Sequence, residues 1–473
     1  MTPLEQYDTI PKAPGGLPMV GHALPLLRDP LAFLASLPAL GELVQIGLGT
    51  QRAVVVCTAD LTRRVLLDSR TFDKGGPLYE RVREVLGQGL GTCPYARHRR
   101  LRRLVQPAFH PARIKAYSPA IARQISSVTD AWQDGQSVDV SSQMTVSTSR
   151  ALMATTFGTA LSPQQTTHAG EDIKVITSVV YARMLQPAWL RGLPLPGNRR
   201  FERANARIRE TITAVAAGRR VHGTAPACDP GKTTEHGSSL LSILLATQDT
   251  ETDGQGMTDS ELADELVTFF LAGIETTAIL LAWALYLLAR HPGIERRLHT
   301  EVDTVLAGRL PAHEDLPRLE LTGRILTETL RLYPPVWLLT RTVTTDTPLA
   351  GWQIPAGTTI IWSPYLLHHD PSLYPDPENF DPDRWKTSTP HQDSYLPFGT
   401  GARKCIGDTF ALTEATLALA HIASHWQLRP APGSRVRARA AASLWPEGLR
   451  MQITARGIPP ATSTGQARAG TDQ

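Results

Sequence analysis

The segment around Cys405 has the composition expected of a cysteine that binds a metal. The cysteine follows Arg403 in the glycine-containing sequence FGTGARKCIG, directly before the helical stretch DTFALTEATLALA. A nearby cation and the amino end of a helix each lower the pKa of a thiol, and glycines let the backbone turn tightly around a large ligand. Each of these features favours a thiolate, the form of cysteine that binds metals.

Three further cysteines, Cys57, Cys93 and Cys228, form no CxxC pair and have no metal-ligand spacing. An isolated cysteine is usually a small buried hydrophobic residue, and this would also be the default interpretation of Cys405 alone. However, the full pattern FxxGxRxCxG, which starts at Phe398, resembles the haem-binding loop of cytochromes P450. The resemblance implies that Cys405 is the axial thiolate ligand of haem b (iron protoporphyrin).

An acid and a hydroxyl, Glu275 and Thr276, lie next to each other inside a long apolar stretch, in the sequence AGIETT. The ordinary interpretation is that Glu275 faces a polar crevice and that Thr276 bonds back to the carbonyl four residues earlier. Beside the cysteine loop, the pair resembles the acid–alcohol couple with which cytochromes P450 deliver protons to bound dioxygen. The resemblance implies that both residues are catalytic and that Ala272 and Gly273 leave space for oxygen beside the haem.

A candidate ion pair, Glu328 and Arg331, lies three residues apart in the helical stretch ILTETLRLYPP. Such pairs are common on helix surfaces, where they contribute little stability, so a solvated pair is the ordinary interpretation. Further along, the segment FDPDRW resembles the family segment whose arginine, here Arg384, completes a buried Glu-Arg-Arg triad. The implied role is structural, because such a triad would hold the core behind the cysteine loop.

Several side chains are candidates for binding the two haem propionates, which need cationic or hydrogen-bonding partners when buried. His98 and Arg102 lie four apart on a helix and resemble the family's WxxxR contact, with histidine replacing the commoner tryptophan. Arg341 and Arg403 match other propionate-binding arginines of the family, although a solvated position is an equal alternative for Arg341. The cofactor-binding positions implied by the resemblance are His98, Arg102, Ala272, Arg341, Phe398, Arg403 and Cys405.

Residues above the haem would select the substrate, and most candidates for this role are apolar or small, which predicts an apolar molecule of modest size. The expected lining comprises Leu78, Tyr79, Thr268, Phe269, Ala272, Trp337 and Leu338. The stretches FDKGGPLYERVREVLGQGLGTC and HRRLRRLVQPAFHPARI are similar to those of bacterial terpene-oxidising cytochromes P450. We therefore expect a terpenoid of secondary metabolism, with a macrolide, steroid or fatty acid as alternatives on the same fold.

Other haem-thiolate functions remain open at this stage. A ligand-binding protein without turnover would need Cys405 but neither Glu275 nor Thr276, so the intact acid–alcohol pair argues against it. An isomerase, a dehydratase or a peroxide-driven enzyme commonly has an altered pair in this family. A monooxygenase is therefore the first expectation.

The chain contains no flavin or nicotinamide fingerprint, so electrons are expected from separate proteins, a ferredoxin and its reductase. Three arginines, Arg99, Arg100 and Arg103, lie on the helical segment that carries His98. They are equally well interpreted as a solvated helix face or as a docking patch for an acidic ferredoxin.

A long helix that begins after Thr258 and continues to about residue 289 must position the acid–alcohol pair. Thr258 can cap its first turn and Glu261 can reach back, and Pro292 ends it. Since the helix is apolar on most sides, we expect it to cross the core. A transmembrane span is disfavoured because Glu265 and Glu275 interrupt the apolar sequence.

The rest of the chain predicts one large, mainly α domain with small β-sheets. Two short β-like runs, GELVQIGLG and RAVVVCT, precede a mostly helical middle, and the stretch 221–238 has the composition of an exposed loop. The resemblance implies a cytochrome P450 fold over residues 10–457, with the haem between the long helix and the cysteine loop. Residues 1–9 would form an extension and 458–473 a disordered tail.

The overall composition agrees with a folded protein and excludes some function classes. Hydrophobic residues make up 42% of the chain and charged residues 19%, with a formal net charge of +4. The small net charge and the lack of a basic stripe interleaved with aromatics disfavour a nucleic-acid binder. Four cysteines are too few for a disulfide scaffold and no signal peptide is visible, so a reducing cytoplasm and no transmembrane anchor are expected.

Overall fold

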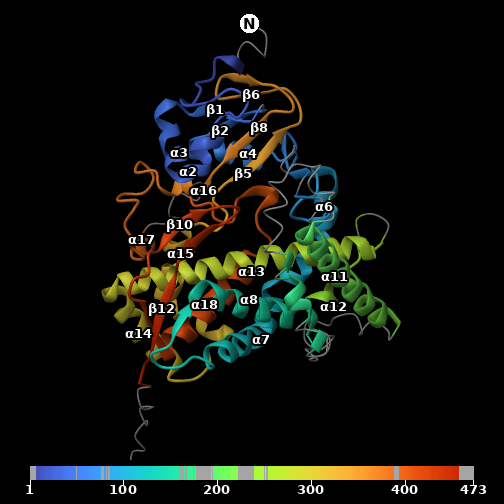
Figure 1. Ribbon diagram of the computed structural model, residues 1–473. Coiled ribbons are helices and arrows are strands. Elements are labelled where there is room, and N and C mark those ends of the chain that lie inside the picture. Colours follow the sequence, from blue (N-terminus) through green and yellow to red (C-terminus); the bar gives the residue numbers. More distant parts are fainter. Residues whose placement is uncertain are drawn as a thin grey trace, which may run out of the picture.

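The computed structural model describes residues 7–457 except 50, 76–78, 81, 84–85, 159–163, 166–167, 174, 177–192, 194, 222–238, 250, 252–253 and 388–393. Figure 1 shows a large helical part and, at one end, a smaller part that contains most of the strands. The expected loop, apart from Val221, and the expected tail lie outside the described residues. The prediction of a mainly α chain with small sheets is confirmed.

The α-helices of the described part are α2 (Ala23–Arg28), α3 (Pro30–Ser36), α4 (Ala59–Leu67), α6 (Tyr95–Val105), α7 (Pro111–Thr129), α8 (Val140–Phe157), α11 (Pro196–Val221), α12 (Leu240–Ala246), α13 (Asp259–Arg290), α14 (Pro292–Leu306), α15 (Glu320–Leu332), α16 (Pro364–His368), α17 (Arg384–Thr387) and α18 (Asp408–His425). Short 3-10 helices are η1 (Leu37–Leu40), η2 (Gln106–Phe109), η3 (His313–Arg318) and η4 (Gly401–Arg403).

Helix α13 begins where the sequence predicts it and ends one residue beyond the expected end. The Thr258 hydroxyl accepts a hydrogen bond from the Glu261 N–H at 3.2 Å, and the Glu261 carboxylate accepts one from the Thr258 N–H at 3.1 Å. Two backbone donors at the start of the helix are thereby satisfied. Pro292 opens the next helix, α14, and so separates the two helices.

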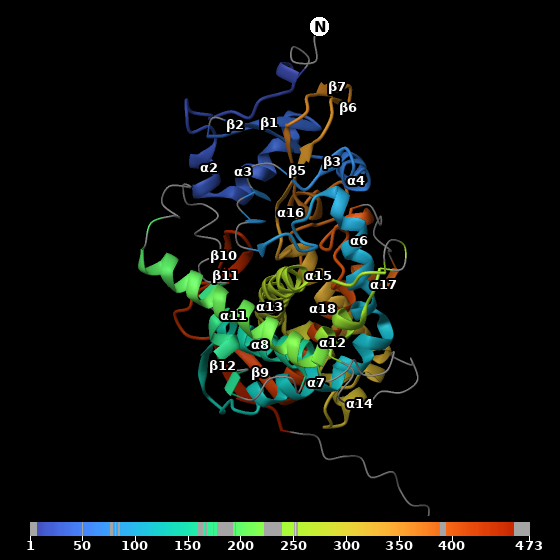
Figure 2. The same ribbon diagram turned by 90° about the vertical axis from the view of Figure 1, so that its right-hand side faces the viewer.

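The core of the molecule is built around α13. This helix packs against α8, α15 and α18, and Figure 2 looks nearly along its axis. Although α13 is long and apolar enough to cross a membrane, 83% of its most apolar window is buried inside the protein. Its hydrophobic character therefore reflects a position at the centre of the fold.

The strands are β1 (Leu43–Leu48), β2 (Gln51–Val56), β3 (Phe72–Asp73), β4 (Ser137–Asp139), β5 (Leu339–Val343), β6 (Thr347–Leu349), β7 (Trp352–Ile354), β8 (Thr359–Trp362), β9 (Trp426–Pro430), β10 (Arg437–Ala440), β11 (Leu444–Glu447) and β12 (Arg450–Ala455). The largest sheet has the order β1-β2-β8-β5-β3, and β1 and β2 are the two runs predicted from the sequence. Tyr7, within the expected extension, packs with Ile10 in the hydrophobic cluster of this sheet.

One pairing in the large sheet matters for the site. Strand β3 runs antiparallel to β5, with Phe72 opposite Val343 and Asp73 opposite Thr342. The pairing brings the residues that follow β3 next to Arg341, although the two segments are far apart in the sequence.

Candidate active site

The cysteine loop is closed by backbone hydrogen bonds. The Cys405 N–H donates to the Phe398 carbonyl at 2.9 Å, and the guanidinium of Arg102 on α6 donates to the Lys404 carbonyl at 2.7 Å. Gly401 has a φ of +71°, and an added Cβ there would lie 2.9 Å from the backbone oxygen of Leu66 on α4. Glycine is therefore required where the loop packs against α4.

The Cys405 side chain is accessible to solvent, yet so many protein atoms surround it that burial is the largest effect on its thiol. Burial raises the pKa of Cys405, while the backbone N–H of Gly407 and the cations Lys74 and Arg102 oppose this shift. Accessible atoms deep in a protein lie next to internal space. Ala272, in the middle of the core helix α13, is also exposed, which indicates space beside that helix as well.

Cations gather near Cys405. Arg341 and Arg403 are almost fully buried, and burial together with these two arginines lowers the pKa of Lys74 to about 7. Burial, Arg403 and Lys74 also lower the pKa of the buried His98 to about 3. The four side chains therefore share one small region in which positive charge is disfavoured.

This cation cluster, defined as Lys74, Arg341 and Arg403 together with the uncharged His98 beside them, has little compensating negative charge. Arg403 pairs with Asp73 at 2.6 Å, but its buried Nε has no hydrogen-bond partner among the described residues. Buried cations without anionic partners are costly, so the cluster is suited to an anionic ligand. A haem, which presents two propionates and an iron that prefers a thiolate in such a loop, fits the donors present.

Lys74 is a member of the cluster that the sequence did not assign to the cofactor. Its ammonium donates to the Gly91 carbonyl at 2.8 Å. Lys74 directly follows β3 in the sequence. This position indicates a place near Arg341 only when the pairing of β3 with β5 is known. Arg102, predicted to contact a propionate, instead donates to the carbonyls of Ala402 and Lys404, and its propionate contact stays a prediction.

The acid–alcohol pair lies on α13 within the core. Glu275 is buried and its Oε1 accepts a hydrogen bond from the Trp445 indole at 2.8 Å, a partner that the sequence did not reveal. The Thr276 hydroxyl donates to the Ala272 carbonyl at 2.6 Å, as the ordinary interpretation expected. Since a hydroxyl donating one hydrogen bond can still accept others, Thr276 keeps acceptor capacity next to the exposed Ala272.

The predicted triad residues come together at the Glu328 carboxylate. Glu328 and Arg331 are completely buried and form two hydrogen bonds at 2.8 and 2.9 Å. Arg384 donates a hydrogen bond to the same carboxylate at 3.0 Å, and the indole N–H of Trp385 donates another to it at 2.8 Å. The remaining Arg331 donors bind carbonyls, including that of His368 at 2.8 Å. The buried charges of Glu328 and Arg331 thus compensate each other and the Arg331 donors are satisfied, while Arg384 adds a second cation at the less buried side of the group.

The side chains expected to line the substrate space lie in different surroundings. Thr268 is buried and donates to the Asp264 carbonyl, while Phe269 packs edge-to-face against Phe109 with ring centroids 5.3 Å apart. The hydroxyl oxygen of Tyr79 accepts a hydrogen bond from Arg341 of the cation cluster.

Of the other expected lining residues, Trp337 donates its indole N–H to the Ala441 carbonyl and packs in the hydrophobic cluster beside the large sheet, with Leu338 against it. Ala272 is exposed on α13. Leu78 lies outside the described residues. The substrate-binding roles of all these side chains stay predictions.

The arginines considered as a docking patch have partners within the chain. Arg103 forms hydrogen bonds with both oxygens of the buried Asp249, and Arg100 pairs with Glu261 at 2.8 Å. Arg99, with a side chain 81% exposed, lies 3.1 Å from Glu251. Arg100 thus ties α6 to the first turn of α13, and Arg103 ties α6 to the segment between α12 and α13, so Arg99 is the most exposed of the three arginines.

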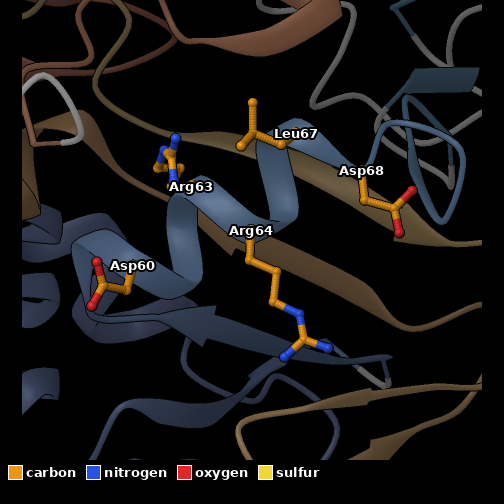
Figure 3. Close-up of a pocket in the computed structure, with 5 residues that line it drawn as sticks. All are labelled: Asp60, Arg63, Arg64, Leu67 and Asp68. Atoms are coloured by element: carbon orange, nitrogen blue, oxygen red, sulfur yellow. The ribbon is translucent and has the colours of Figure 1, made fainter.

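A shallow hollow of about 710 Å³ lies on α4, lined by Asp60, Arg63, Arg64, Leu67 and Asp68 (Figure 3). Its lining carries both signs of charge and contains neither the cysteine nor the acid–alcohol pair. It is therefore a surface feature beside the cysteine loop and not the reaction site.

A thiol on a glycine-rich loop, a cluster of buried cations and an acid–hydroxyl pair on a core helix together define a haem-thiolate protein. The chain belongs to the cytochrome P450 family, whose family description, Cytochrome P450, matches residues 11–450. It is accordingly an oxidoreductase, a monooxygenase that uses dioxygen, a haem with a thiolate ligand and a separate source of electrons.

Relatives and solved structures agree with this assignment. The chain is 46% identical to cyclooctatin synthase of Streptomyces melanosporofaciens, with 93% of this chain and 94% of the relative covered. It is 41% identical to pentalenene oxygenase of Streptomyces avermitilis, with 94% and 97% covered. The crystal structure of the cytochrome P450DA heme domain has a TM-score of 0.83 at 27% identity, with 96% and 99% covered. The predicted fold is thereby confirmed.

Proposed function

We propose that this protein oxygenates a terpenoid of bacterial secondary metabolism, with haem b bound through Cys405. The observation that carries the proposal is the sequence identity of 41–46%, over more than nine-tenths of the chain, to relatives whose names refer to terpenoids. Besides the two above, these include cyclooctat-9-en-7-ol 5-monooxygenase of Streptomyces melanosporofaciens, which is 43% identical. The apolar helix face around Ala272 and the absence of a flavin or nicotinamide fingerprint are consistent with this function.

Residues of four segments would hold the haem. Cys405 would ligate the iron, and Arg341, Arg403, His98 and Lys74 would bind the propionates. The bound group supplies the oxygen-activating chemistry, and the protein supplies position and charge.

Glu275 and Thr276 would pass protons toward the space beside Ala272. The Trp445 indole fixes the Glu275 carboxylate, and the Thr276 hydroxyl oxygen retains acceptor capacity for the next proton. Thr276→Ala removes that hydroxyl, so substrate oxygenation supported by electron donors should fall about tenfold or more, the size expected for a lost proton-transfer group. Peroxide-driven oxygenation should be largely kept. Equal losses in both assays would contradict the proton-delivery role.

The substrate proposal is tested with two compounds that appear in the names of the relatives, cyclooctat-9-en-7-ol and pentalenene. The haem-loaded protein is titrated with each probe and with lauric acid, and the spectral shift and oxygenated products are measured. Saturable shifts and single-oxygen products with a terpenoid support the proposal. Turnover of the fatty acid and of neither terpenoid would overturn it.

We also propose a ferredoxin and its reductase as the electron donors, and a cytoplasmic location. Arg99 is exposed on α6, one turn before Arg102, which contacts the cysteine loop. Arg99→Glu should slow ferredoxin-supported turnover about two- to fivefold at low salt, because a surface charge mainly affects association. The control is Arg437→Glu on β10, an exposed arginine on a separate element. Equal rates for both variants would remove Arg99 from the docking surface.

A further inference from the structure

The glycine-rich segment Leu86–Cys93 lies directly against the first half of α13. An added Cβ at Gly87 would come within 2.1 Å of the Asp264 carboxylate, and one at Gly89 within 2.6 Å of the Thr268 hydroxyl. Gly87 also has a φ of +69°, and a Cβ at Gly89 would lie 2.9 Å from the Asp264 backbone oxygen, so both positions favour glycine. The segment is therefore shaped for close contact with the helix.

Two carboxylates of α13 hold this segment through its backbone. Asp264 accepts a hydrogen bond from the Gln88 N–H at 2.8 Å, and Glu265 accepts one from the Leu90 N–H at 2.8 Å. Glu265 is completely buried, and its Oε2 has no hydrogen-bond partner among the described residues. Asp264, in contrast, also pairs with Arg209.

The opposite edge of the same segment binds the cation cluster. The Gly91 carbonyl accepts a hydrogen bond from Lys74 at 2.8 Å, and the Cys93 carbonyl accepts one from Arg403 at 2.8 Å. A few residues thus connect the buried carboxyl of Glu265 to two cations beside the cysteine. Any displacement of the segment would move the carbonyls that orient those cations.

We propose that Glu265 is a positioning residue, which holds the segment Leu86–Cys93 on α13 and thereby orients Lys74 and Arg403. The role of those cations toward haem rests on the proposed function, whereas the attachment of the segment does not. Glu265 itself touches neither the cysteine loop nor the acid–alcohol pair in any described contact.

The protonation state of Glu265 gives the proposal a measurable signature. Burial raises the pKa of this carboxyl to about 8, and Asp264 and Glu261 on α13 add to the shift. The Leu90 N–H and Arg97 on α6 oppose it, and Cys93 faces it from the segment. At neutral pH the closed segment therefore covers an uncharged carboxyl.

Opening of the segment exposes Glu265 to water, where its pKa returns to the ordinary value near 4.5. The open state then loses the proton at a lower pH than the closed state. By linkage, the opening equilibrium should rise by up to about tenfold per pH unit between about pH 5 and 8, and level off above pH 8.

Hydrogen exchange of the full-length, haem-loaded protein measures this opening directly. Exchange rates at the Leu90 amide and its neighbours are divided by the intrinsic rates at each pH, from pH 5 to 9. The wild type should show the rise and plateau, and Glu265→Gln, which keeps an acceptor but does not titrate, should remove the rise. The matched control Asp264→Asn, at the neighbouring attachment point, should keep it.

A second variant tests the attachment without pH. Glu265→Leu leaves the Leu90 N–H buried without an acceptor, so this amide should exchange about tenfold faster than in the wild type at pH 6. An unchanged exchange rate, or a rise with pH in Glu265→Gln equal to that of the wild type, would overturn the proposal. If Glu265→Leu does not fold, the glutamine variant decides. Neither measurement depends on substrate, so failure of the terpenoid proposal would leave this result intact.

Discussion

Two regions of this molecule bury positive charge, and they differ in how far the chain itself compensates that charge. In the triad, Arg331 is surrounded by the Glu328 carboxylate and backbone carbonyls, so charge and donors are matched within the chain. In the cation cluster, Lys74 and Arg341 lie close to Arg403, whose Nε has no partner in the described part of the chain. The donors of Arg331 are satisfied within the chain, whereas the cation cluster is suited to an anionic ligand.

The difference assigns separate roles to the two regions. A self-satisfied buried ion group contributes to the native structure, and breaking it leaves an uncompensated charge. A surplus of buried cations lowers the stability of the chain alone and stabilises the complex with an anion that binds there. Each region can be tested by removing one charge.

The largest effect is expected at the triad. Glu328→Ala leaves the buried Arg331 without its carboxylate, so the free energy of unfolding should fall by about 3–5 kcal/mol, measured by denaturant unfolding. Glu320→Ala, at an exposed position on the same helix, is the control and should change it by less than about 0.5 kcal/mol. A loss at Glu328 no larger than at Glu320 would show that the triad is not a closed unit.

Removing a charge from the cation cluster should weaken haem binding. Lys74→Met removes one cation while keeping an unbranched apolar stem, so haem affinity should fall about tenfold or more, as expected for loss of a charge-assisted hydrogen bond. Haem transfer to an apoprotein acceptor measures this change. Unfolding of the haem-free variant should not become easier, in contrast to Glu328→Ala. Unchanged haem affinity would remove Lys74 from the propionate partners.

A second effect at Lys74 concerns pH. Because burial and neighbouring arginines lower the pKa of Lys74 from 10.5 to about 7, the folded chain disfavours the charged form that the unfolded chain keeps. The cost to the haem-free protein is largest below about pH 7. It decreases by up to about 1.4 kcal/mol per pH unit as the pH rises toward 10.5. The difference in unfolding free energy between wild type and Lys74→Met should follow this slope, and a constant difference from pH 7 to 9 would contradict it.

How much of each region the sequence predicted follows from how local its contacts are. The triad pair Glu328 and Arg331 lies within one helical turn, and Arg384 lies in a recognisable segment, so all three could be named in advance. The membership of Lys74 depends on the pairing of β3 with β5, across some 270 residues, which no local pattern encodes.

Other long-range partners were hidden for the same reason. The sequence leaves Arg103 open between a solvated helix face and a docking patch, because the buried Asp249 that binds it lies 146 residues away. Trp337 stays a predicted lining residue, and the partner of its indole N–H, the Ala441 carbonyl near the end of the chain, could not be read from the sequence. The sequence specified which residues could react, and tertiary packing decided what surrounds them.

The central claim is that Cys405 ligates the iron of a haem whose propionates the cation cluster binds. The carbon monoxide spectrum of the reduced protein tests it most directly, because the Soret band is shifted strongly to the red only when a thiolate is the axial ligand. We expect this band in the wild type and its loss in Cys405→Ser. A wild-type spectrum without the band, or a band that persists in Cys405→Ser, would contradict the claim.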